Sequence, residues 1–251
     1  MANIEDNQHA FCIRPPNLKA LLISVVVVTG LSISNDAEAF RVPMDAERAP
    51  AFTAQKSMTD KPMHQALGHR IAKAALERTE SPVTYDPAYR KLAYPNGDVA
   101  SDRGVCSDVI IRVLRGVGLD LQKSVHEDMR ANFSAYPRLW SAARPDPNID
   151  HRRVPNLETF FTRAGARRPQ STNPKDFRAG DIVAWNLRGK AGVLPHIGIV
   201  TDKKGASGWP MIVHNIGRGP QHEDVLLLWP ITGHYRLSDD LITAIAEYGA
   251  V

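Results

Sequence analysis

The spacing of apolar residues changes once along this chain, near Gly180, and this change limits the folds that the chain can adopt. Between residues 65 and 161, apolar residues recur at three- and four-residue steps, which is typical of helices with one buried face. After Gly180 they form short runs separated by Gly, Lys, Asp and Pro, which is typical of strands. Helices followed by strands within one domain predict an α+β fold.

The same patterns predict individual elements. We expect helices at residues 65–80, 105–117 and 125–133, and a short helix that begins at Pro155. Ser101 or Asp102 would cap the second helix. We expect strands of a mostly antiparallel sheet at residues 181–187, 197–201, 211–214 and 225–229.

The first 39 residues have the pattern of an export signal. Arg14 and Lys19 precede an apolar run from Ala20 to Ile33, and a small-x-small motif ends at Ala39. The run is shorter than the roughly 20 residues that span a bilayer, which favours a cleaved signal peptide and a periplasmic or secreted protein. An uncleaved membrane anchor and a buried helix of the domain are the alternatives, and we expect membrane contact only through this segment.

Cleavage would leave a mature chain of one domain. Residues 40–62 are polar and mixed and predict a flexible lead-in, and residues 63–251 form the predicted hydrolase domain. The signal holds two basic and four acidic residues, so the net charge rises from +4 to +6 on cleavage. This charge favours an anionic partner only weakly. The basic residues are scattered, so we expect no nucleic-acid binding, and we expect a monomer.

Cleavage would also remove Cys12 and leave Cys106 as the only cysteine. A single thiol cannot form a disulfide within its chain, so it is inert, intermolecular or functional. Cys106 lies at the start of a predicted helix, where the helix dipole and free N–H groups lower a thiol pKa. The same N–H groups can stabilise the oxyanion of an acyl-transfer reaction.

Two histidines on predicted strands supply the base that a nucleophilic cysteine needs. His196 begins one strand, and His214 lies near the far end of the next. Antiparallel pairing of these strands would bring both side chains to the same edge of the sheet. We predict that Cys106 is the nucleophile, that His196 is the general base and that His214 orients His196, with Asn215 as the alternative orienting residue.

Short motifs around these residues resemble a known family. The segments Val105-Cys106-Ser107, Gly180-Asp181, Pro195-His196-Ile197-Gly198 and Ile212-Val213-His214 are similar to those of the papain-like NlpC-type cysteine peptidases of bacterial cell walls. The resemblance implies a papain-like fold, with N-terminal helices packed on the sheet, and cleavage of amide bonds in peptidoglycan stem peptides. The segments at 148–157, 214–217 and 233–236 more closely resemble an uncharacterised family of exported bacterial proteins, and this resemblance supplies no substrate.

The resemblance also implies further site residues. In NlpC-type peptidases, a tyrosine about a dozen residues before the cysteine assists the oxyanion site, and Tyr94 has this spacing, with Tyr85 as its competitor. Asp108 replaces the usual small residue, where it would raise the thiol pKa or bind a cationic group of the substrate. His151 and Arg152 belong either to a cleft wall that binds peptide carboxylates or to a solvated loop.

The residues therefore predict an exported cysteine hydrolase that uses a Cys-His-His mechanism and no cofactor. A non-catalytic module that binds cell wall or another ligand on the same scaffold is one alternative. A zinc hydrolase is another. However, none of its candidate ligands forms a short-range metal-binding pair, so we predict no metal. Those candidates are His151, His214, His222, Glu223, Asp224 and His234.

Overall fold

The computed structural model describes residues 61–140 and 143–248, with side chains from residue 66 onward. The predicted signal peptide, Cys12 and the lead-in up to residue 60 lie outside the described residues. None of the helices in the described part has the length and hydropathy needed to cross a membrane.

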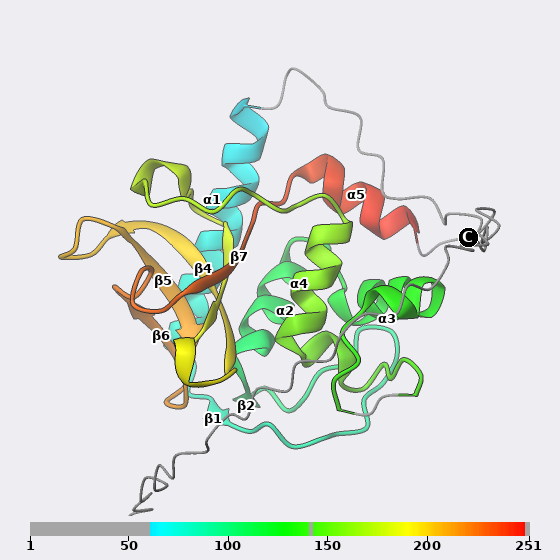
Figure 1. Cartoon of the computed structure of the whole chain (residues 1–251). Coiled ribbons are helices and arrows are strands. Elements are labelled where there is room, and N and C mark those ends of the chain that lie inside the picture. Colours follow the sequence, from blue (N-terminus) through cyan, green and yellow to red (C-terminus); the bar gives the residue numbers. More distant parts are fainter. Residues whose placement is uncertain (1–60, 141–142, 249–251) are drawn as a thin grey trace, which may run out of the picture. The chain divides into compact units, whose positions relative to one another are not determined.

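The described chain contains five α-helices and a five-stranded sheet (Figure 1). The helices are α1 (Lys61–Glu77), α2 (Cys106–Gly116), α3 (Leu121–Asn132), α4 (Val154–Arg163) and α5 (Asp239–Tyr248). The strands of the sheet are β3 (Ile182–Asn186), β4 (Pro195–Lys204), β5 (Pro210–Asn215), β6 (Pro220–Glu223) and β7 (Ile231–Tyr235). Their order is β6-β5-β4-β3-β7, and every neighbouring pair is antiparallel.

Two hydrophobic clusters cover the two faces of this sheet. The larger cluster joins buried residues of all five helices to Ile182, Ala184, Ile197, Ile199 and Val213, so the helices occupy one face. Figure 1 shows α2, α3 and α4 together on that side. The smaller cluster contains residues that alternate with these along the strands, including Val183, Trp185, Val200 and Ile212, together with Leu226 from a loop. The predicted α+β arrangement, N-terminal helices on a mostly antiparallel sheet, is confirmed.

Three details differ from the sequence-based predictions. Residues 225–229 are not a strand but a turn, and they are apolar because Leu226, Val225 and Trp229 pack against the second face of the sheet. The strands β6 and β7 and the helix α5 were not predicted. Neither Ser101 nor Asp102 caps α2, because the helix begins later, at Cys106.

A close crossing of two glycines fixes α1 against the start of β3. A Cβ atom added to Gly180 would lie 2.5 Å from Cα of Gly68, and a Cβ atom added to Gly68 would lie 2.3 Å from the carbonyl oxygen of Ala179. Gly180 also has a φ of +85°, which residues with a side chain rarely adopt. Both requirements explain why glycine precedes Asp181 at this point.

We predict that Gly180→Ala lowers the free energy of unfolding by about 3 kcal/mol, because the backbone of Gly68 cannot move aside without displacing α1. Gly118→Ala is the matched control, since Gly118 has a φ of +97° but no atom within 4 Å of an added Cβ. The control should cost only about 1–2 kcal/mol of backbone strain. Urea denaturation of both variants measures the difference, and equal losses would contradict the steric argument.

Candidate active site

Cys106 is the first residue of α2 and lies directly after the short strand β2 (Arg103–Gly104). The strand β1 (Thr84–Tyr85) pairs in parallel with β2, so that Tyr85 lies opposite Gly104. One carboxylate oxygen of Asp108 accepts a hydrogen bond of 2.6 Å from the backbone N–H of Val105 and closes the first turn of the helix. The prediction that the cysteine stands in the first turn is confirmed.

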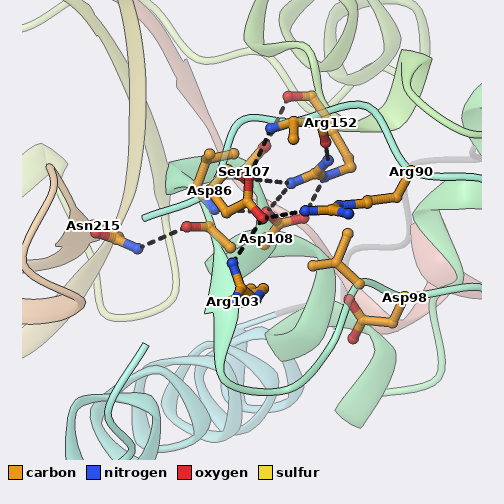
Figure 2. A network of polar contacts seen from close by, with 12 residues as sticks. Asp86, Arg90, Asp98, Arg103, Ser107, Asp108, Arg152 and Asn215 are labelled. Carbon is orange, nitrogen blue, oxygen red and sulfur yellow. Dashed lines mark hydrogen bonds and ion pairs between the residues drawn. The ribbon is translucent and has the colours of Figure 1, made fainter. Parts of the chain in front are cut away.

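A buried ion pair holds the start of α2 in place (Figure 2). Arg152 donates two hydrogen bonds of 2.9 Å to the carboxylate of Asp108, one to each oxygen. The two side chains are only 2% and 3% exposed. Such a bidentate ion pair fixes both the distance and the orientation of the two side chains.

Arg152 also connects this helix to the loop that follows β1. Its guanidinium donates to the backbone carbonyls of Asp86 and Ala88, each at 3.2 Å. Its own carbonyl accepts a hydrogen bond of 2.8 Å from the hydroxyl of Ser107. The ion pair therefore joins three segments that surround Cys106: the helix start, the loop after β1 and the 3₁₀ turn Asp150–Arg152.

The two histidines form a hydrogen-bonded chain at one end of the sheet. Nε2 of His196 lies 2.7 Å from Nδ1 of His214, and Nε2 of His214 lies 2.8 Å from a carboxylate oxygen of Glu223 on β6. Gly198 pairs with His214 across the strands, and an added Cβ there would lie 3.1 Å from Cβ of His214. A side chain at position 198 would therefore crowd β5 at His214 and its neighbours.

Aromatic rings enclose this histidine pair. The ring centroids of Trp185 and Trp229 lie 6.0 and 6.1 Å from that of His196, and Trp229 lies 6.2 Å from His214. Burial therefore lowers the pKa of His196 to about 3, with the neighbouring His214 as a second cause. Burial also lowers the pKa of His214, while Glu223 opposes this shift. Both imidazoles are neutral at pH 7.

The thiol of Cys106 contacts the main chain of β4 beside His196. Burial raises its pKa to about 11, and the backbone N–H groups of Ile197, Ser107 and Cys106 itself oppose this rise. The helix start thus favours the thiolate as the sequence predicts, but burial has the larger effect. In the part of the chain that the structure describes, no hydrogen bond joins the thiol of Cys106 to the ring of His196. Catalytic contacts of this kind often form only when substrate is bound.

A cavity of about 420 Å³ opens at Cys106. Pro195, the first residue of β4, lines it together with Cys106, so the starts of α2 and β4 meet at the same cavity. The exposed rings of Tyr89 and Trp140 form part of its wall, and the guanidinium of Arg153 lies 4.3 Å above the ring of Trp140. None of the described residues that line the cavity carries a carboxylate, which makes it suited to an anionic group.

Tyr85 and Tyr89 line this cavity, whereas Tyr94 does not. Tyr85 lines the cavity, and the cysteine is one of the groups that raise its pKa to about 12, after the larger effect of burial. Tyr94 instead packs edge-on against His126, and its hydroxyl donates a hydrogen bond to Glu127. The spacing that selected Tyr94 is therefore misleading, because the pairing of β1 with β2 brings the earlier tyrosine to the cysteine.

Other predicted substrate-binding residues have structural contacts instead. Arg152 and Asp108 are buried and bind each other, so neither side chain is free for a charged group of the substrate. His151 does not line the cavity, so it is not part of a cleft wall there. It is 2% exposed and its burial lowers its pKa to about 4, so it does not belong to a solvated loop either. Asn215 donates to the carbonyl of Gly104 and does not contact His196, so the orienting contact belongs to His214.

Two parts of the site were not recognised in the sequence. Glu223 was considered only as a zinc ligand, and its contact with His214 depends on a strand that was not predicted. The pairing of Asp108 with Arg152 joins residues 44 positions apart, although an acid in the first turn of a helix was visible. Within the described ranges, the structure brings together no group of three His, Cys, Asp or Glu side chains able to hold a metal ion.

The geometry defines an α+β protein with a cysteine at the start of a helix and two histidines on the sheet that follows. Residues 72–237 match the family described as a domain of unknown function (DUF1287), and the chain belongs to this family. It is 56% identical over 166 residues to the uncharacterized protein YijF of Escherichia coli (strain K12). This match covers 66% of this chain and 80% of that protein.

Among solved structures, the chain is similar to NlpC1 from Trichomonas vaginalis. The TM-score is 0.38 and the sequence identity is 12%. The match covers 72% of this chain and 46% of that protein, so the chain spans less than half of its length.

We predict that Asp108→Asn lowers the free energy of unfolding by about 3–5 kcal/mol, because it leaves the buried guanidinium of Arg152 without a counter-charge. Asp98→Asn is the control. Asp98 also binds arginines, Arg112 and Arg115, but at a partly exposed position, where a loss of about 1 kcal/mol or less is expected. Urea denaturation compares the two, and a similar small loss in both would show that the buried pair contributes little.

Alkylation by iodoacetamide should report the burial of Cys106. The thiolate is the reactive form, so a pKa raised from 9.0 to about 11 makes the reaction slow at pH 7 and lets its rate rise until about pH 11. Mass spectrometry of the peptide that contains Cys106 measures the rate, with urea-unfolded protein as the control. A midpoint at or below pH 9 in the folded protein would contradict this prediction.

Proposed function

We propose that this protein is an exported cysteine hydrolase that cleaves amide bonds, with the peptide stems of peptidoglycan as its substrate. The observation that carries the proposal is the hydrogen-bonded chain from His196 through His214 to Glu223, together with the contact of the Cys106 thiol with the backbone N–H of Ile197, the residue after His196. A chain of this kind holds one imidazole in a fixed orientation and tautomer, which a general base requires.

In the proposed reaction, the sulfur of Cys106 attacks the amide carbon and a C–S bond forms. Nδ1 of His196 accepts the thiol proton during the attack, since both groups are neutral beforehand, and passes it to the departing amine as the C–N bond breaks. Water, activated by the same imidazole, then hydrolyses the thioester. His214 and Glu223 act through His196 as positioning residues.

The oxyanion formed during attack would be stabilised by donors that face the thiol. The backbone N–H groups of Cys106 and Ile197 are near the sulfur, and they are fixed by α2 and β4. The phenol of Tyr85 is protonated at pH 7, as any tyrosine is, and burial raises its pKa further, to about 12, so it can donate a hydrogen bond at the same cavity.

The cavity supports a peptide substrate that carries a carboxylate. Arg153 lines its wall and pairs with Asp150 through Nη1 alone, and the aromatic rings of Tyr89 and Trp140 offer apolar contact. The stem peptides of peptidoglycan contain free carboxylates. The predicted export signal and a relative from a bacterium support the same substrate, because this polymer lies outside the bacterial cytoplasm.

The burial of Cys106 favours one competing function, a non-catalytic module that binds the cell wall. The cysteine is 6% exposed, and a thiol with a pKa of about 11 is not activated before a ligand binds. The two functions differ in turnover, so a product assay separates them.

Digestion of purified sacculi by the mature protein tests the proposal. Wild-type protein should release muropeptides, Cys106→Ala should release none, and His196→Ala should be slower by a factor of about 10²–10⁴. Mass spectrometry identifies the products and the bond that is cut. Equal release by wild type and Cys106→Ala would refute the thiol mechanism, and binding without any release would favour the wall-binding module.

A further inference from the structure

A second cavity, of about 550 Å³, lies at the other end of β4 from the catalytic histidines. Thr201 and Lys204 line it, whereas His196 is the second residue of the same strand. Thr201 lies five positions after His196, which corresponds to about 17 Å along a strand. The two cavities have no lining residue in common, so this one is a separate place on the protein.

The buried carboxylate of Asp181 lies at this cavity and is paired with other groups of the chain. Asp181 is buried, and its carboxylate accepts hydrogen bonds from His234 at 2.7 Å, from Arg236 twice at 2.6 Å and from the backbone N–H of Arg178 at 2.8 Å. Its negative charge is therefore already neutralised by the chain itself. Nε and Nη2 of Arg236 make these bonds, which leaves Nη1 available to a ligand.

The remaining charge at the cavity is positive. Lys175, Arg178, Lys204 and Arg236 line it, against the two carboxylates of Asp181 and Asp202. The side chains of Lys175, Arg178 and Lys204 form no ion pair with another described residue. Burial lowers the pKa of Arg168, and the nearby charges of Arg236 and Arg178 lower it further, while Asp181 opposes them. Positive charges gathered around a concave surface attract an anion.

The wall of the cavity is also partly apolar. Phe177, Pro210 and Leu237 line it, and the ring of Phe177 stacks on that of His234 at 4.5 Å. A volume of this size, with apolar walls and a few converging polar groups, is typical of a site for a small molecule. Inorganic phosphate alone would leave these apolar walls without contact.

We propose that this second cavity binds a small anionic molecule with a phosphate or carboxylate group on an apolar body. Arg178, Lys204 and Nη1 of Arg236 hold the anionic group, and the apolar part contacts Phe177 and Leu237. The site also gives a role to the segments Gly180-Asp181 and 233–236, which the proposed hydrolase reaction does not use. The proposal does not depend on that reaction.

Isothermal titration with phenyl phosphate tests this site on the mature protein. Phenyl phosphate should bind more tightly than inorganic phosphate, and benzyl alcohol should bind least, since it has the ring but no charge. The double variant Arg178→Gln/Lys204→Gln should bind phenyl phosphate at least about tenfold more weakly. Both residues are exposed, so the variant should fold normally.

Controls separate this cavity from the site at Cys106 and from general charge effects. Lys190→Gln/Arg218→Gln removes two exposed charges outside both cavities and should bind as wild type does. Arg153→Gln and Cys106→Ala should keep the binding that Arg178→Gln/Lys204→Gln loses, whatever the sacculus digestion shows. Unchanged binding by Arg178→Gln/Lys204→Gln, loss of binding in Arg153→Gln, or no binding of phenyl phosphate at all would overturn the proposal.

Discussion

The buried ion pair between Asp108 and Arg152 is the contact on which the candidate site depends. Removing two charges from water is costly, and the cost is offset only when the geometry is good and the remaining hydrogen bonds are satisfied. Both conditions hold here, because Asp108 also accepts from Val105 and Arg152 also donates to the carbonyls of Asp86 and Ala88. The pair thereby fixes the helix start that carries Cys106 and the loop that follows Tyr85.

Burial has a second consequence, because it sets the chemistry that the site can perform. A buried thiol and a buried imidazole both prefer their neutral forms, so the pKa of Cys106 rises and that of His196 falls. A stable ion pair before substrate binding is therefore disfavoured. In the proposed reaction, the proton therefore moves during attack on the substrate, when the developing oxyanion meets the backbone N–H groups around the sulfur.

Much of the fold followed from local patterns, and the error at residues 225–229 has a clear physical cause. The helices around Cys106 and Pro155 and the strand pair that carries His196 and His214 have strong periodic or apolar signals. Residues 225–229 have the same apolar signal as a strand, yet they form a turn whose side chains pack on the second face of the sheet. A short apolar run shows that a segment is buried, but it does not show which backbone conformation buries it.

The sequence by itself determined the class of fold, the cysteine at a helix start and the two histidines at one sheet edge, because these depend on periodicity and on the order of neighbouring strands. Only the tertiary structure decided which tyrosine reaches the cysteine, that Glu223 follows His214, and that Arg152 binds Asp108 and not a substrate. These contacts join residues far apart in the chain, and local patterns contain no information about which distant segments meet. Burial, which shifts the pKa of Cys106 upward, is likewise a property of the folded protein alone.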